Sequence, residues 1–222
     1  MSLRQKPQGK QDYARVQYYD IVTECLKIKN GGTAMNIKPI ETIYNGYRFR
    51  SRAEARWAVF FDACKIQYMY EPEGLRLSDG TLYLPDFYLP ESKTYFEVKG
   101  IMNDIDMHKI KQLQKDLGVS VAIGYADMTF QSSDQWGKDS FSISYKEDSL
   151  FVKCYECGKY YFVGNIGSYV CMNCGYYGGD NTFDIISIGD SQGKLFWGHD
   201  HSKIKNPFDI AKQARFEHGE HG

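Results

Sequence analysis

The sequence predicts an α/β protein in which helices flank a mixed sheet, with a small metal-binding module after it. Apolar residues recur at helical spacing over residues 52–65 and 105–117. A near-continuous apolar run over 119–125 is typical of a strand that is buried on both faces. Two Cys-x-x-Cys pairs follow, and paired cysteines of this kind favour a metal site.

Length and charge restrict the class of protein. The chain has 222 residues, 42% of them apolar, which suggests one domain or one domain with a small module. The net charge of −1 excludes a bulk polycation, so nucleic-acid binding would depend on local basic groups. The polar start predicts no signal peptide, and no run approaches the roughly 20 apolar residues of a membrane span. We therefore expect a cytoplasmic protein that is neither secreted nor bound to a membrane.

Residues 1–35 are interpreted as an N-terminal extension that is partly disordered or helical. Residues 1–12 are polar and glycine-containing, and 13–29 carry a loose apolar stripe. Gly31-Gly32 can be encoded by a ribosome-binding sequence just ahead of Met35. Two alternatives stay open: Met35 is the native start, or the first 34 residues form a genuine N-terminal helix.

The main globular core is expected over residues 36–148. Residues 40–50 predict a short hairpin around Asn45-Gly46, a favoured type I′ turn pair. Ser51 is a good N-cap for the helix that ends near Lys65, and Glu54 completes a capping box. A strand is expected over 67–71.

The second half of this core begins with two apolar runs within Leu84–Gly100 that predict paired strands. The helix over 105–117 should turn Ile105, Ile110, Leu113 and Leu117 inward, and Gly118 should cap it. A crossover helix makes the strands on either side of it parallel. The predicted order is helix, three strands, helix, strand.

Charged side chains should meet on the paired strands. Glu97 and Lys99 are two residues apart and point to one face, while Phe96 and Val98 point to the other. If Asp86 lies across from Glu97, two carboxylates and an ammonium converge. Burying these charges is costly unless something pairs them. We therefore expect a divalent cation held by the carboxylates, with Lys99 beside it.

This pattern resembles the PD-(D/E)xK nuclease superfamily, with Pro85-Asp86 followed by Glu97-Val98-Lys99. Residues 44–58 are similar to the opening of its phage-type members, and the resemblance covers roughly residues 40–125. It implies a restriction-endonuclease-like core, and a bacterial or phage-infected cell as the setting. It also implies that Mg²⁺ or Mn²⁺ is held by Asp86, Glu97, the Val98 carbonyl and Glu54. Glu54 thus has two interpretations, as capping residue and as metal-site carboxylate.

The implied activity is metal-dependent hydrolysis of phosphodiester bonds, with DNA as the expected substrate and RNA not excluded. Lys99 would orient the attacking water or contact the phosphoryl oxygen. Phosphate contacts are assigned to Arg50, Arg52 and Arg56 around the helix start, and to Lys109. A solvated face is the alternative for any one of them. The sequence leaves a homodimer open.

The cysteine pairs predict a zinc ribbon over residues 149–180, with Zn²⁺ held by Cys154, Cys157, Cys171 and Cys174. A glycine follows each pair, as a knuckle turn requires. Four thiolates leave no open coordination position, so the zinc is expected to be structural. Two disulfides or redox dithiols are the alternatives. Residues 181–222 are expected to form a hairpin, from 183–188 and 194–197, and a helix over 208–216.

Two further functions compete with the nuclease. One is a non-catalytic adaptor on a nuclease-like core, in which the zinc ribbon grips nucleic acid or another protein. The other is an inhibitor of host defence, suggested by the phage-like residues. Cleavage of DNA would distinguish the nuclease from both.

Overall fold

A computed structural model describes residues 39–133, 143, 149–154, 156–164, 171, 173–176, 185–190 and 207–216, with only the backbone for 185–190. The chain divides into two compact units, Met1–Lys38 and Pro39–Gly222. The predicted helix over 13–29 and the question of Met35 lie outside the described residues.

The second unit starts with the predicted hairpin and helix. Strands β1 (Thr42–Tyr44) and β2 (Tyr47–Phe49) pair antiparallel around Asn45-Gly46, and both turn residues have positive φ. Helix α2 (Arg52–Cys64) follows, capped by Ser51, whose side chain accepts a hydrogen bond from Glu54 N. Lys65 ends the helix in the left-handed conformation. The N-cap and the C-terminus of this helix are therefore confirmed.

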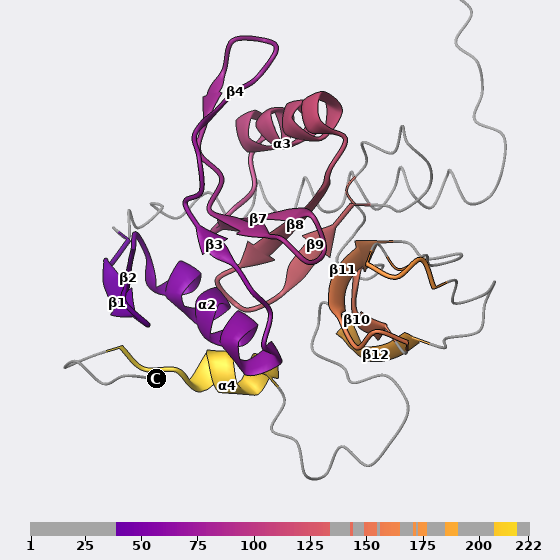
Figure 1. The fold of residues 1–222 in the computed structure, drawn as a ribbon. Coiled ribbons are helices and arrows are strands. Elements are labelled where there is room, and N and C mark those ends of the chain that lie inside the picture. The colour runs from indigo at the N-terminus through magenta and orange to yellow at the C-terminus, as the bar shows by residue number, and fades with distance from the viewer. Residues whose placement is uncertain are drawn as a thin grey trace, which may run out of the picture. The chain divides into compact units, whose positions relative to one another are not determined.

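The centre of the fold is a mixed five-stranded sheet in the order β3-β6-β7-β8-β9 (Figure 1). Its strands are β3 (Met69–Tyr70), β6 (Phe87–Leu89), β7 (Thr94–Lys99), β8 (Ser120–Tyr125) and β9 (Phe130–Ser132). Only β7 and β8 pair in parallel, as a crossover helix requires, and the other neighbours are antiparallel. The α/β class is confirmed, whereas the restriction-endonuclease likeness of this core stays a prediction.

One strand and one hairpin of this region were not predicted. Strand β9 lies in a segment whose sequence shows no clear period, and it extends the sheet beyond β8. Strands β4 (Leu75–Arg76) and β5 (Leu82–Tyr83) form a small separate hairpin between β3 and β6. Both strands of this hairpin are two residues long, too short for alternation to be recognised.

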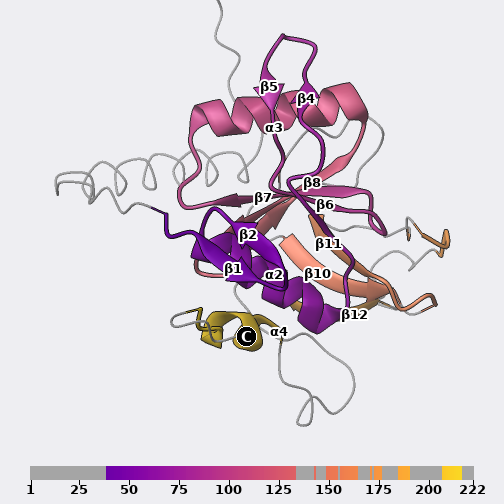
Figure 2. The ribbon, with the colours of Figure 1, turned by 60° about the vertical axis from the view of Figure 1, so that its left-hand side comes forward.

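The helices cover opposite faces of the sheet. Figures 1 and 2 show α3 (Asp104–Leu117) on one side of β7 and β8 and α2 on the other. Ile110 and Leu113 of α3 pack in one buried cluster with Val121 and Ile123. The prediction that Ile105 and Leu117 face inward is wrong, since 69% and 45% of their surfaces are exposed. Burial is confined to the middle of this helix, where Gln114 also takes up core space by bonding to Ser133 Oγ.

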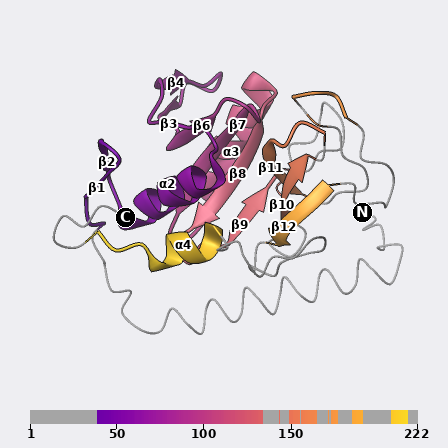
Figure 3. The same cartoon turned by 60° about the horizontal axis from the view of Figure 1, so that its bottom comes forward.

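The face under α2 carries a large aromatic core that extends past the central sheet. It includes Trp57, Phe60 and Phe61 of α2, together with Phe87 and Phe96 of the sheet. Helix α4 (Pro207–Gln213) lies along α2, as Figure 3 shows, and buries Phe208 and Ala211 in the same cluster.

The cysteine-containing segment forms a second sheet, in the order β11-β10-β12. Its strands are β10 (Ser149–Cys154), β11 (Tyr160–Gly164) and β12 (Ile185–Asp190). Phe151 of β10 and Phe162 of β11 belong to the aromatic core of α2. Strand β12 pairs with β10, and the predicted partner segment 194–197 lies outside the described residues.

Candidate functional site

Strand register brings Asp86 and Glu97 together. Phe87 pairs with Phe96 across β6 and β7, so Asp86 stands opposite Glu97. Asp86 N lies 3.4 Å from Glu97 Oε1, and Val98 N donates to Asp86 Oδ2 at 2.8 Å. Only 5% and 1% of these two acidic residues are exposed. Two carboxylates are thus buried next to each other on the α3 side of the sheet.

Lys99 completes this group, as the two-residue period of β7 requires. Its Nζ lies 2.9 Å from Glu97 Oε2 and 3.8 Å from Asp86 Oδ2. Burial acts to lower the pKa of Lys99, but the charges of Glu97 and Asp86 outweigh it and raise the pKa. Lys99 is therefore a cation at neutral pH when no metal is present.

The electrostatics of Asp86 are unusual for an aspartate. Burial and then the charge of Glu97 raise its pKa from 3.8 to about 7. The ammonium of Lys99 and the Val98 N–H act in the opposite direction and compensate only in part. Near neutral pH Asp86 is therefore partly protonated, and a bound cation would favour its charged form.

Arg50, whose predicted phosphate contact stays a prediction, pairs with two carboxylates in the structure. Its Nη2 lies 2.8 Å from Asp86 Oδ1 and its Nε lies 2.7 Å from Glu71 Oε1. The side chain is 55% exposed, so it reaches Asp86 from solvent. Arg50 thus forms the outer wall of the site and has a second acidic partner in Glu71.

Glu54 acts as a capping residue in the structure. Its Oε1 accepts from Ser51 Oγ at 2.8 Å, and its Oε2 accepts from Arg50 N at 3.1 Å and from the Tyr70 hydroxyl at 2.7 Å. The capping interpretation is therefore confirmed. The backbone N–H that donates to the Glu54 carboxylate belongs to Arg50, the residue before the N-cap. Its charge also raises the pKa of Asp86, as the last of several causes. Its metal-binding role stays a prediction.

Tyr83 of β5 was missed by the sequence reasoning. Its hydroxyl is buried and makes no hydrogen bond of normal geometry with any residue that the structure describes. Burial, followed by the charge of Glu97, raises the pKa of this phenol. A hydrogen-bonding interaction with the Glu97 side chain also contributes to the raised pKa, so Tyr83 presents a neutral O–H to the carboxylate pair. Only recognition of the short β4–β5 hairpin could have placed it there.

The other predicted basic residues lie away from the carboxylates. Arg52 and Arg56 are on α2 and line hollows beside α4. Lys109 is half-buried on α3, one turn beyond Asp106, whose charge acts on Lys99. Within the described residues, none of the three forms an ion pair with Asp86 or Glu97.

The four predicted zinc ligands come together. One sulfur atom from each of Cys154, Cys157, Cys171 and Cys174 lies within 4.8 Å of every other, and these cysteines carry no disulfide. The sulfur atoms of Cys157 and Cys171 lie 3.5 Å apart, and those of Cys154 and Cys174 lie 3.8 Å apart. A tetrahedral zinc with bonds of about 2.3 Å would separate its sulfurs by roughly 3.8 Å. The cluster could thus hold a metal such as zinc.

Backbone geometry supports this arrangement. In each knuckle the glycine N–H donates to the first cysteine carbonyl, Gly158 to Cys154 at 2.9 Å and Gly175 to Cys171 at 2.8 Å. Both glycines have the predicted positive φ. The Tyr161 hydroxyl lies 3.2 Å from Cys171 Sγ. The thiols are therefore oriented by the two turns and by Tyr161, without a disulfide between them.

Comparisons add no known relative. No protein-family model matches the chain, and no curated protein matches it. No helix among the described residues has the length and apolar character that a membrane crossing requires. The geometry of the carboxylate pair and of the cysteine cluster is therefore the basis for inferring a function.

Proposed function

We propose that the protein is a metal-dependent nuclease that hydrolyses phosphodiester bonds, with DNA as the preferred substrate. The observation that carries this proposal is the buried Asp86–Glu97 pair with Lys99 beside it. A carboxylate pair is expensive to bury for structural reasons alone, because apolar residues of similar size would serve the core at least as well.

The residues fit a hard divalent cation. Mg²⁺ and Mn²⁺ prefer oxygen ligands, and the site offers two carboxylates, of which Asp86 has a pKa that burial and then the charge of Glu97 raise to about 7. The Val98 N–H faces Asp86, and in an extended strand the N–H and carbonyl of a residue share one edge. Asp86, Glu97 and the Val98 carbonyl would thus hold the ion. Glu54 is linked to Asp86 through Arg50, which donates hydrogen bonds to both carboxylates.

The bound cation would lower the pKa of a water molecule and stabilise charge developing on the phosphate. The chain itself supplies the remaining functions. Lys99 Nζ, held by Glu97, donates hydrogen bonds to the phosphoryl oxygen or the attacking water. Arg50 can exchange Asp86 for a phosphate, since Glu71 keeps its Nε in place. The Tyr83 hydroxyl is a further donor beside Glu97.

The cysteine cluster is proposed to be a structural zinc centre. Four protein thiolates fill a tetrahedral zinc and leave no position for substrate. Its strands contribute Phe151 and Phe162 to the aromatic core, so the metal would stabilise the same core that supports the catalytic strands.

A cleavage assay tests the nuclease. Purified protein is incubated with linear, circular, branched and single-stranded DNA and with RNA, with Mg²⁺ or without added metal. We expect Mg²⁺-dependent cleavage by the wild type and by Glu73→Gln, an exposed acid outside the site. Asp86→Asn and Glu97→Gln should lose at least about a hundredfold in rate. Cleavage by Asp86→Asn at the wild-type rate would refute the assignment.

The adaptor hypothesis makes the opposite prediction for the same samples. Its structural basis would be the ion pairs of Arg50 and Lys99, which partly neutralise the carboxylates without any metal. It predicts nucleic-acid or protein binding that is equal with and without Mg²⁺, and no cleavage of any substrate.

A further inference from the structure

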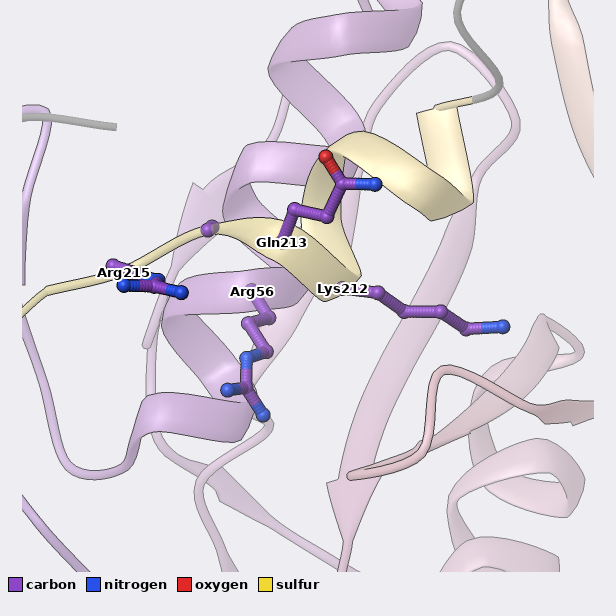
Figure 4. Close-up of a pocket in the computed structure, with 5 residues that line it drawn as sticks. Arg56, Lys212, Gln213 and Arg215 are labelled. Carbon is purple, nitrogen blue, oxygen red and sulfur yellow. The ribbon is translucent and has the colours of Figure 1, made fainter.

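Basic side chains from α2 and from the end of α4 surround two adjoining hollows. The larger, of about 580 Å³, is lined by Arg56, Lys212, Gln213, Ala214 and Arg215. The smaller, of about 300 Å³, shares several of these residues and adds Arg52 and Phe216. Figure 4 shows Arg56 projecting from α2 between Lys212 and Arg215. Among the described residues that line the hollows, none is acidic.

The basic side chains of this surface lie close enough to repel one another. Arg52 and Arg56 are four residues apart on one helix, a spacing at which like charges repel. Arg52 is also the first residue of α2, where the helix dipole disfavours a cation. Arg56 Nε is buried without a hydrogen-bond partner among the described residues. An anion in the hollow would relieve each of these costs.

Core packing holds the two helices in this arrangement. Phe208 of α4 lies 4.4 Å from Phe60 of α2, ring centre to ring centre, and Ala211 is completely buried. Beyond the helix, Phe216 packs edge-on against Tyr44 at 6.0 Å. The backbone that carries Lys212 and Arg215 is therefore held against α2 by buried contacts on one side and a half-buried ring contact on the other, so the four cations form a preorganised surface.

We propose that these hollows bind the phosphate groups of a nucleic-acid backbone. The surface begins at Arg52, two residues from Glu54, and Arg50 connects that end of α2 to Asp86. A strand bound in the hollows would thus lead towards the carboxylate pair. The identity of the anion as nucleic acid rests on the proposed function, whereas the anion site itself rests on the hollows and their cations.

Salt-dependent binding tests this site. The affinity of Asp86→Asn protein for a labelled DNA duplex is measured over a series of KCl concentrations without magnesium, so that no cleavage intervenes. Adding Arg56→Gln and Lys212→Gln should weaken binding and reduce the slope of log K against log salt by about 2. The matched pair Lys111→Gln and Lys115→Gln, exposed on α3, should leave the slope unchanged.

A second pair of substitutions tests whether misfolding explains a weaker binding. Lys212→Gln with Arg215→Gln changes only exposed side chains, and it should lower the slope by a similar amount while the melting temperature stays constant. An unchanged slope for both pairs would overturn the proposal, as would equally tight binding of polyglutamate. These outcomes are separate from cleavage. If Asp86→Asn abolishes cleavage but both pairs of basic substitutions leave the salt slope unchanged, phosphate binding in the hollows is rejected and the nuclease proposal stands.

Discussion

At the scale of single residues, Asp86 is the group whose chemistry is most altered by the fold. It lies between Glu97, Lys99 and Arg50, and burial dominates its titration. Its pKa is near 7 in the folded protein and close to 4 in an unfolded chain. Because the folded state binds this proton more tightly, Asp86 favours folding at low pH. This contribution is lost as the pH rises through about 7.

Asp86→Asn should therefore stabilise the metal-free protein in a pH-dependent way. Asparagine keeps an acceptor for Val98 N, while Arg50 retains Glu71 and Lys99 retains Glu97. We expect the free energy of unfolding of the variant, relative to wild type, to rise between pH 4 and 7 by at most roughly 4 kcal/mol. Urea denaturation at several pH values measures it, and a difference that does not change with pH would contradict the account.

Part of this residue-level arrangement could be predicted. Alternation along β7 places Glu97 and Lys99 on one face, and the short turn between the two runs puts Asp86 opposite Glu97. The partner of Arg50 could not be predicted, since an exposed arginine gives no periodic signal. Tyr83 was missed because its hairpin is too short to show alternation, and its position depends on tertiary packing.

At the scale of elements, one glycine in β8 determines how closely α2 packs against the sheet. A Cβ at Gly124 would lie 2.5 Å from Trp57 Cε2 and from Phe96 Cζ. Trp57 is also fixed by a hydrogen bond from its Nε1 to the Tyr125 carbonyl at 3.1 Å. The rings therefore cannot move away easily, and α2 approaches the sheet closely only because this strand position has no side chain.

Gly124→Ala should destabilise the protein by about 3 kcal/mol, at the upper end of the range for overpacked cores. Gly74→Ala is the matched control, since a Cβ there meets nothing within 4 Å and its φ is not positive. Its stability should change by less than about 1 kcal/mol. Thermal denaturation of the two variants gives the comparison, and equal stability would show that the α2–β8 contact is less tight than described.

Helix α3 shows where pattern reasoning fails at this scale. Its boundaries and its Gly118 cap agree with the prediction. The inward side chains agree only for Ile110 and Leu113, because a helical stripe records which residues are apolar and not how far the partner sheet extends. Asn103, which caps the helix through a bond from Asp106 N at 2.9 Å, was also not foreseen.

At the scale of the whole molecule, the cysteine-bearing sheet and the central sheet share one core. Phe162 of β11 lies within 5.1 Å of both Phe96 and Phe130, ring centre to ring centre. Backbone and side-chain bonds join the sheets too, including Gly164 N to the Ser133 carbonyl at 3.1 Å. Loss of a metal held by the four cysteines should consequently perturb the aromatic core as well as the knuckles. The sequence predicted the knuckles but not this shared packing, because long-range aromatic contacts leave no local pattern.

Cys171→Ser should lower the melting temperature of the entire second unit in a single transition. Serine removes one thiolate and the sulfur contacted by Tyr161. Near-ultraviolet circular dichroism reports the aromatic core, and zinc content is measured on the same sample. An unchanged core signal with zinc lost, or two separate transitions, would mean that the cysteine-bearing sheet folds independently.

The central claim is that the buried Asp86–Glu97 pair is a site for a divalent cation. Binding of Mn²⁺, followed by electron paramagnetic resonance, tests it without relying on catalysis. The account predicts one Mn²⁺ per chain in the wild type and in Lys99→Met, and loss of that ion in Asp86→Asn and Glu97→Gln. Mn²⁺ binding of equal strength by wild type and Asp86→Asn, or no binding by the wild type, would contradict it.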